Sequence, residues 1–233
     1  MYSNNDFALR NVDSENYDEY QMPAYLKAVL TDSKARILDF GCGFGQMISA
    51  LKLNKFENVE GADIDASAIK FLREHDIAVH DLTSELDFYD THQGGFDYVI
   101  MSHVLEHFPK SEIITQLQRL KNILKPGGAL IVMVPNAQSN TGCYWAYEDF
   151  THHLLFTSGS LYYVLKASGF SSVEFLDIDC TAGTQSSIKR VARRFLLRLY
   201  RWNLGFWNRV TSSAYHDASP LVFSYEIKAL ARV

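Results

Sequence analysis

A glycine-rich turn between two acidic residues is the first feature of the sequence that could do chemistry. Gly41, Gly43 and Gly45 follow a short apolar run that contains Asp39. Because glycine has no Cβ, backbone amides in such a turn can approach a ligand closely. Asp39 could accept a hydrogen bond from an ammonium group, and Asp63, 22 residues past Gly41, could bind both hydroxyls of a ribose. The alternative is a turn whose glycines only permit unusual φ angles.

The spacing of the glycines separates two kinds of nucleotide ligand. Dinucleotide enzymes combine a G-x-G-x-x-G turn with a pyrophosphate at a helix N-terminus. Here the third glycine comes one residue early, and the acidic Asp39 precedes the turn, which suits an amino acid cation better than a pyrophosphate. The sequence therefore argues against NAD.

Two segments contain histidines that could move a proton, because the pKa of histidine lies near neutral pH. In the first, Glu106 and His107 follow an apolar run, and His103 lies four residues before His107. If this turn is helical, the three residues share one face and could form a metal patch. A structural or cofactor-side role and proton transfer are the alternatives, and we expect no bound metal.

The second segment, residues 148–158, offers His152 as an acid–base group or as a ligand of the acceptor. Asp149 precedes His152 by three residues, so the pair could instead cap a helix that starts near Ser158. Aromatic residues just before the segment could line an acceptor pocket or belong to the core: Tyr144, Trp145 and Tyr147.

The elements that must position these residues alternate between short apolar runs and helix-like stretches. We expect strands at 35–40, 59–64, 77–80, 96–102 and 129–134, and helices at 46–53, 67–74 and 111–124. Asp65 or Ser67 is suited to cap the second helix, and Ser111 the third. The tail adds a helix at 158–168 and two antiparallel strands at 173–179 and 223–232. This alternation implies a parallel sheet covered by helices on both faces.

In this order, the segments resemble the motifs of class I methyltransferases that use S-adenosylmethionine (SAM), of the type 11 and type 23 groups. ILDFGCGFGQ is similar to the first motif, GADIDASAI to the second, and FDYVIMSHVLEHFP and LKPGGALIVMVPN to those of the fourth and fifth strands. The resemblance covers roughly residues 35–136. It implies a Rossmann-like α/β fold with a seven-stranded, mostly parallel sheet in the order 3-2-1-4-5-7-6, strand 7 antiparallel. SAM would be the cofactor and S-adenosylhomocysteine its product.

The residues that the resemblance assigns to the cofactor lie at the ends of four strands: Asp39, Gly41, Cys42, Gly43, Asp63, Ile64, Asp81, Leu82, Ser102 and His103. Asp39 and the glycine turn would hold the methionine part, and Asp63 the ribose hydroxyls. Asp81 would take the adenine amino group and Leu82 would pack on the adenine ring. Ser102 and His103 would flank the sulfonium.

The resemblance also bears on the acceptor. Residues 149–161 are similar to a D-x-T-H-x-x-x-F-T-x-x-S-L stretch in methyltransferases of cell-surface glycan biosynthesis, in which His152 matches the histidine and His153 has no counterpart. Some relatives that act on quinol precursors carry Glu-x-x-Glu-His for a divalent ion, and this chain has His103 at the first of those positions. The favoured reaction is O-methylation of a saccharide or glycan precursor, with catalysis by His152, His107 and Glu106. The alternatives are a small aromatic, quinol or lipid acceptor, and an idle SAM-fold scaffold.

Composition favours one compact domain, which the resemblance places at 34–233. The resemblance also implies that a segment and helix at 1–33 cover the cofactor, through Tyr17 or Tyr20. The chain has 233 residues, of which 47% are hydrophobic. It has three widely spaced cysteines, no signal sequence and no apolar run long enough to span a bilayer, which predicts a cytoplasmic protein. A net charge of −5 gives no reason to expect nucleic acid as the main partner.

Residues 180–220 form a basic insertion before the last strand. Between Asp179 and Asp217 lie seven basic residues and no acidic one, so the rest of the chain carries −12. Apolar residues recur in steps of three and four over 188–210, although Asn203 and Gly205 argue against one unbroken helix. This segment could cover the acceptor pocket, bind phosphate groups of the acceptor, or lie on an anionic membrane at its inner surface. The sequence does not predict the oligomeric state.

Overall fold

The computed structural model describes residues 17–214 and 220–233. Residues 1–16 of the predicted N-terminal segment and 215–219 of the predicted insertion lie outside the described residues. The strands are β1 (Arg36–Phe40), β2 (Asn58–Asp63), β3 (Val79–Asp81), β4 (Phe96–Ser102), β5 (Leu124–Pro135), β6 (Ser172–Leu176) and β7 (Glu226–Arg232). The helices are α2 (Ala24–Val29), α3 (Gln46–Leu53), α4 (Ala66–Glu74), α5 (Phe88–Thr91), the 3-10 turn η1 (Leu105–His107), α6 (Ile113–Ile123), α7 (Gly142–Glu148), α8 (Ser158–Ala167) and α9 (Ser187–Val210).

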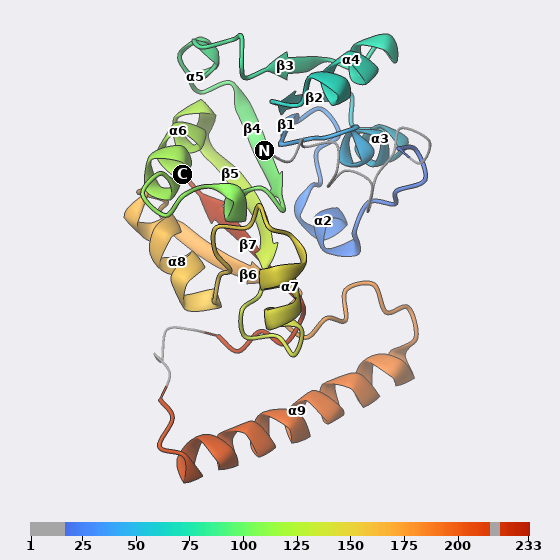
Figure 1. Cartoon of the computed structure of the whole chain (residues 1–233). Coiled ribbons are helices and arrows are strands. Elements are labelled where there is room, and N and C mark those ends of the chain that lie inside the picture. The colour runs from blue at the N-terminus through green and yellow to red at the C-terminus, as the bar shows by residue number, and fades with distance from the viewer. Residues whose placement is uncertain (1–16, 215–219) are drawn as a thin grey trace.

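The strands form one seven-stranded sheet in the order β3-β2-β1-β4-β5-β7-β6 (Figure 1). Neighbours among β1 to β5 pair in parallel, and β7 runs antiparallel to both β5 and β6. The predicted Rossmann-like α/β fold and its strand order are confirmed. The carboxyl ends of the parallel strands meet at one edge, where a ligand of such a sheet binds.

Alternating side chains of the strands divide the core between two layers. Ile37 belongs to a cluster with residues of α2, α3 and α4, whereas its neighbour Leu38 packs with residues of α5, α6 and α8. Successive residues of a strand point to opposite faces, so a strand covered on both faces must be apolar throughout. This explains the nearly continuous apolar runs by which the strands were predicted.

Local hydrogen bonds confirm one predicted helix cap and correct another. Asp65 caps α4, since its side chain accepts from the backbone N–H of Ser67 and Ala68. The predicted cap at Ser111 is wrong, because α6 begins two residues later with Glu112 at the N-cap. The backbone N–H of Glu112 donates to the carbonyl of Pro109 at 2.9 Å, so a turn precedes the helix.

The basic segment is a single helix, contrary to the expectation that Asn203 and Gly205 would interrupt it. α9 runs without a break from Ser187 to Val210. Its many leucines and arginines are good helix formers, and one interior glycine costs only about 1 kcal/mol relative to alanine. Among residues 17–214 and 220–233, no helix combines the length and the apolar composition needed to cross a membrane.

Candidate active site

The turn after β1 has a backbone geometry that glycine adopts easily. Gly41, Gly43 and Gly45 have φ angles of +76°, +50° and +82°. A Cβ at Gly41 would lie 2.3 Å from Cγ2 of Val104, whereas no heavy atom lies within 4 Å of that position at Gly43. The turn is therefore closely packed at its start and open at Gly43, where a ligand can approach the backbone.

Asp39 lies on β1 directly below this turn and is only 3% exposed. Burial and the nearby charge of Asp63 raise the pKa of Asp39 to about 7. A carboxylate that is costly to ionise is suited to a cationic partner, because an ammonium group would stabilise its charged form. This environment agrees with the predicted role of Asp39, which is to accept a hydrogen bond from the ammonium group of an amino acid.

Asp63 ends β2 and organises the same turn from the side. Its Oδ2 accepts the backbone N–H of Gly43 at 2.7 Å. Its Oδ1 accepts the N–H groups of Ile64 and Asp65 at 2.7 and 2.9 Å. The carboxylate therefore holds the glycine turn in place, a role that its predicted contact with ribose did not include.

The predicted adenine residues follow β2 and β3. Asp81 pairs with Asp63 in the register of the two strands, and its Oδ1 accepts from the N–H and hydroxyl of Thr83 at 2.9 and 2.6 Å. Ile64 is exposed. Leu82 is partly buried against the core and lines a cavity beside α5 and α6. The structure brings Asp81 to the predicted edge, and the contact of Leu82 with adenine stays a prediction.

A cleft of about 660 Å³ opens at the carboxyl edge of the sheet, within the size range of small-molecule sites. It is lined by five predicted cofactor residues: Asp39, Gly41, Cys42, Ser102 and His103. Of the two tyrosines expected to close over the cofactor, Tyr20 lines the cleft. Tyr17 instead packs edge-on against Phe71, with ring centroids 5.2 Å apart.

Six further lining residues were not predicted as part of the cofactor site: Pro23, Tyr25, Gln46, Met47, Tyr225 and Glu226. The last two lie at the start of β7. Glu226 pairs with Pro135, the last residue of β5, in the antiparallel register. An antiparallel strand begins at the edge where its parallel neighbours end, so the predicted topology did contain a signal for these positions.

His103 follows β4 and joins the cleft to a buried carboxylate. It is a non-glycine residue with φ of +54°, a conformation that is uncommon and often found at functional sites. Its Nε2 lies 3.0 Å from Glu226 Oε2, and its Nδ1 lies 3.3 Å from Glu106 Oε1. Burial opposes the charge of the ring, but these two carboxylates outweigh it and raise the pKa of His103 to about 9. An imidazolium cannot accept a proton, so His103 is not the base at neutral pH.

The two histidine segments that the sequence treats as separate lie together in the structure. The rings of His107 and His152 are 4.8 Å apart, and His152 Nε2 lies 3.9 Å from Glu106 Oε1. Possible ligand atoms of these three residues all lie within 4.8 Å of one another. The residue that joins Glu106 and His107 is thus His152. The predicted metal patch of His103, Glu106 and His107 does not form, because the turn is a 3-10 turn that starts only at Leu105 and leaves His103 outside it.

Neighbouring atoms decide which ring nitrogen of each histidine is free. His152 Nδ1 lies 2.9 Å from the carbonyl oxygen of Trp145 and must donate to it. The Thr151 hydroxyl donates to Asp149 and therefore accepts from His107 Nδ1, 2.8 Å away. In the neutral ring of either histidine, Nε2 then carries the lone pair. Each neutral imidazole therefore presents Nε2 as a hydrogen-bond acceptor.

Glu106 gives this cluster its negative charge. It is fully buried, and neither carboxylate oxygen accepts an aligned hydrogen bond from the described residues. A buried carboxylate without such partners is unfavourable unless a positive group lies nearby, and the His103 ring, 3.3 Å away, is one such group. His152 Nε2 lies 3.9 Å from the same oxygen, so Glu106 can also stabilise a proton on His152 when that ring becomes charged.

The alternative that Asp149 and His152 cap the next helix is wrong. The N-cap of α8 is Thr157, which forms a capping box with Ser160. The aromatic residues before the cluster lie on α7, a helix that was not predicted from the sequence. Tyr144 and Tyr147 are exposed there, while the ring of Trp145 stands 5.9 Å from that of Tyr225 at the cleft.

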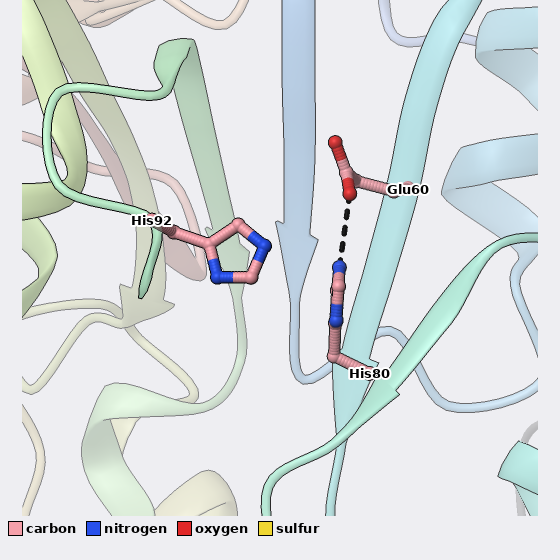
Figure 2. A group of neighbouring side chains, drawn as sticks. All are labelled: Glu60, His80 and His92. Carbon is pink, nitrogen blue, oxygen red and sulfur yellow. Dashed lines mark hydrogen bonds and ion pairs between the residues drawn. The ribbon is translucent and has the colours of Figure 1, made fainter. Parts of the chain in front are cut away.

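A second group of polar side chains lies on β2, β3 and the end of α5 (Figure 2). His80 Nε2 lies 2.9 Å from Glu60 Oε2, and Nδ1 lies 2.8 Å from Glu85 Oε2. The other oxygen of Glu60 accepts from Arg36 Nε at 2.6 Å. His92 completes a set whose possible ligand atoms lie within 4.8 Å. Because both nitrogens of His80 face carboxylates, the protonated ring is favoured, and the group is better described as an ion-pair network than as a metal site.

The comparisons with known proteins agree with this geometry. The family model described as a methyltransferase domain matches residues 14–174, more than half of the chain. The chain belongs to this family. It is therefore a methyltransferase domain of the SAM-dependent class.

The relatives of the methyltransferase domain act on different acceptors. The ubiquinone biosynthesis O-methyltransferase of Xanthomonas axonopodis pv. citri (strain 306) is 30% identical over 123 residues, 48% of this chain and 48% of that enzyme. The tRNA N(3)-cytidine methyltransferase METTL2B of Homo sapiens is 26% identical over 181 residues, 67% of this chain and 48% of that protein. The chain spans about half the length of these curated relatives. A SAM-dependent methyltransferase from Archaeoglobus fulgidus shares the fold, with a TM-score of 0.61 and 22% identity over 86% of each chain.

The cofactor of this methyltransferase domain is SAM, and the residues at the cleft fit it. The buried carboxylate of Asp39 suits the amino group, and the open backbone at Gly43 admits a ligand to the turn. Ser102 and His103 at the end of β4 line the same cleft as Asp39. One cleft therefore collects residues from the ends of β1 and β4, as a nucleoside that carries an amino acid requires.

Proposed function

We propose that the methyltransferase domain transfers the methyl group of SAM to a hydroxyl oxygen, with His152 as the base. The observation that carries this proposal is the hydrogen bond from His152 Nδ1 to the carbonyl of Trp145, which leaves Nε2 as the proton acceptor. The side chain of His152 is only 8% exposed and lies 3.9 Å from Glu106. A hydroxyl acceptor must lose its proton during transfer, and a fixed base beside a buried carboxylate supports that loss.

Bound SAM supplies an electrophilic methyl group on a good leaving group. The protein then has to hold the acceptor oxygen in line and take its proton. The S–CH3 bond would break as the O–CH3 bond forms, with S-adenosylhomocysteine as the leaving group, and the hydroxyl proton would move to His152 Nε2. Glu106 and Asp149, each 3.9 Å from that nitrogen, stabilise the resulting imidazolium. His107 is oriented in the same way by Thr151 and is the second candidate base.

The favoured acceptor class is a saccharide or glycan precursor. Two observations support this acceptor class. Residues 149–161 are similar to a stretch in methyltransferases of cell-surface glycan biosynthesis. The aromatic rings of Tyr144 and Tyr147 on α7 are exposed and suit stacking against a sugar face. The test is release of S-adenosylhomocysteine in a panel of sugar, sugar nucleotide, phenol and quinol acceptors. Turnover with hydroxylated sugars alone supports the assignment, whereas turnover with phenols or quinols alone overturns it.

A quinol or phenol is the second candidate, favoured by the 30% identity to a ubiquinone biosynthesis O-methyltransferase. We infer proton transfer without a metal, since His103 replaces the first carboxylate of the metal-using pattern. Turnover should therefore persist after treatment with a chelator. Loss of turnover, restored by Mg²⁺ or Zn²⁺, would instead assign a metal to Glu106, His107 and His152.

The remaining candidate, an idle SAM-fold scaffold, is tested by equilibrium binding of S-adenosylhomocysteine.

We infer that the described part of the N-terminal segment, residues 17–33, covers the cofactor through Tyr20, which lines the cleft. Tyr20→Ala should then weaken binding of S-adenosylhomocysteine, while Tyr17→Ala, at the tyrosine that packs on Phe71, should leave it unchanged.

A further inference from the structure

Helix α9 is barely covered by the rest of the structure. None of its 24 residues is buried. In Figure 1 it lies along one side of the molecule, apart from the sheet and its covering helices. Its contacts with the domain include the Tyr200 hydroxyl, which donates to Asn140 at 2.9 Å, and the Arg194–Asp179 ion pair at 2.6 Å near its start.

The side of α9 that faces the domain is not its apolar side. The partly covered positions are Arg190, Leu197, Leu204, Gly205 and Asn208, whereas the other positions are exposed. A stripe of apolar residues, offset by two positions from this set, runs the length of the helix: Ile188, Val191, Phe195, Leu199, Trp202, Phe206 and Val210. Two residues of an α-helix turn it by about 200°, so the stripe lies nearly opposite the domain.

This apolar stripe is exposed over its full length. Ile188 is 80% exposed and Trp202 is 73% exposed, and the stripe extends over a helix of 24 residues. A continuous apolar surface of this kind on a folded domain marks an interaction site. It does not cover the acceptor residues, because it faces away from the domain. The predicted role of this segment as a cover over the acceptor pocket is therefore not favoured.

The charge of α9 identifies its partner. The helix contains seven basic residues and no acidic one, in a chain whose remainder carries −12. The basic residues flank the apolar stripe and occupy the domain side: Lys189, Arg190, Arg193, Arg194, Arg198, Arg201 and Arg209. Such a helix lies flat on a membrane, with its apolar face at the acyl boundary and its cations at the phosphate groups.

We propose that α9 docks the methyltransferase domain on an anionic membrane surface, with the stripe from Ile188 to Val210 inserted below the headgroups. The proposal does not depend on the acceptor, because it rests on residues outside the cleft and the histidine cluster.

The test is binding to vesicles of phosphatidylcholine with and without phosphatidylglycerol. Two of the three tryptophans of the chain, Trp202 and Trp207, lie on α9. Co-sedimentation and a blue shift of the intrinsic fluorescence are expected with the anionic vesicles at low salt. Both should weaken with added salt and be nearly absent with pure phosphatidylcholine. Equal binding to both vesicles, or no binding to either, would overturn the proposal.

Matched variants separate the stripe from other exposed apolar residues. The double variant Phe195→Ser, Trp202→Ser should bind anionic vesicles at least roughly tenfold more weakly, whereas Leu53→Ser on α3 should bind as the parent does. Arg198→Gln should weaken binding by about fivefold. Retention of S-adenosylhomocysteine binding shows that each variant is folded.

The competing occupant of the stripe is a second copy of the chain. Sedimentation of the protein without vesicles should therefore give the monomer mass. A dimer that the double variant converts to monomer would overturn membrane docking.

Discussion

The rings of His107 and His152 lie 4.8 Å apart beside the buried carboxylate of Glu106. Each ring is held through Nδ1, by Thr151 and by the carbonyl of Trp145 respectively. Two segments that follow different strands thereby form one cluster of two histidines and a carboxylate. The catalytic roles proposed for these residues lead to the first prediction.

His152→Ala should lower turnover by about 10²–10⁴-fold while the affinity for S-adenosylhomocysteine stays the same, because the variant loses the base but keeps the cleft. His153→Ala is the matched control, since only the backbone N–H of His153, which donates to the carbonyl of Glu106, is engaged with the cluster. A single-turnover assay measures the effect. Equal rates for parent and His152→Ala would return His152 to a structural role.

Asp39→Asn should raise the free energy of unfolding and at the same time weaken binding of the cofactor. The pKa of Asp39 is raised to about 7 in the folded protein, above its value of about 4 in the unfolded chain. Ionisation of this group therefore costs stability, and the cost grows as the pH rises from about 4 to about 7. The variant should unfold with a free energy about 1–3 kcal/mol higher near pH 8, and the gain should vanish near pH 4. Urea unfolding at the two pH values measures it, and a variant less stable than the parent near pH 8 would contradict it.

The same carboxylate should make cofactor binding depend on pH. The charged form of Asp39 binds the amino group, so below its pKa of about 7 binding must first remove a proton. Affinity for S-adenosylhomocysteine should fall by up to about tenfold per unit as the pH drops below about 7. Calorimetry in buffers of different ionisation enthalpy should show proton release at low pH. Asp39→Asn should bind weakly with a flat profile, and an unaltered profile in the variant would assign the dependence to another group.

The strands, the helices and the cofactor edge could be predicted from the sequence because their signals are local. An apolar run such as 96–102 is typical of a buried strand whatever surrounds it. Asp39, Gly41 and Asp63 lie at strand ends, which meet at one edge in any parallel sheet. The parallel α/β class thus followed from patterns within short segments, whereas the strand order followed from the resemblance to the class I methyltransferases.

The cluster of Glu106, His107 and His152 could not be predicted in the same way, because it depends on contacts between distant segments. No local pattern places His152 against Glu106, or Glu226 against His103. The positive φ of His103 and the 3-10 turn after it likewise depend on packing around β4 and not on helix propensity. In α9 a local signal was misleading instead. Asn203 and Gly205 predicted an interruption, but the helix propensity of the whole segment outweighed them.

Asp63 has two roles that a nucleoside analogue can separate. Its carboxylate accepts three backbone N–H groups, among them that of Gly43 at 2.7 Å. Asp63→Ala should therefore lower both the free energy of unfolding and the affinity for S-adenosylhomocysteine, each by about 1–3 kcal/mol. If the carboxylate also binds ribose, the loss of affinity should be smaller for the 2′-deoxyribose analogue, which lacks one partner. Equal losses for the two ligands would assign Asp63 to the turn alone.

The network around His80 should stabilise the protein more in mild acid than in base. Hydrogen bonds with Glu60 and then Glu85 outweigh burial and raise the pKa of His80. Burial acts to raise the pKa of Glu60, but hydrogen bonds from His80 and Arg36 outweigh it and lower the pKa to about 2. Glu60 therefore stays ionised in mild acid. The stabilisation from His80 is complete below its unfolded pKa of about 6.5 and is lost as the pH rises through the raised value.

His80→Gln should accordingly lower the free energy of unfolding by about 1 kcal/mol more near pH 6 than near pH 9. His75→Gln is the matched control, because Nδ1 of His75 contacts the carbonyl of Phe71 and not a carboxylate. Zn²⁺ added to the parent should leave its melting temperature unchanged, since a protonated His80 has no lone pair for a metal. A rise in the melting temperature that His80→Gln and His92→Gln both abolish would show that the group binds metal instead.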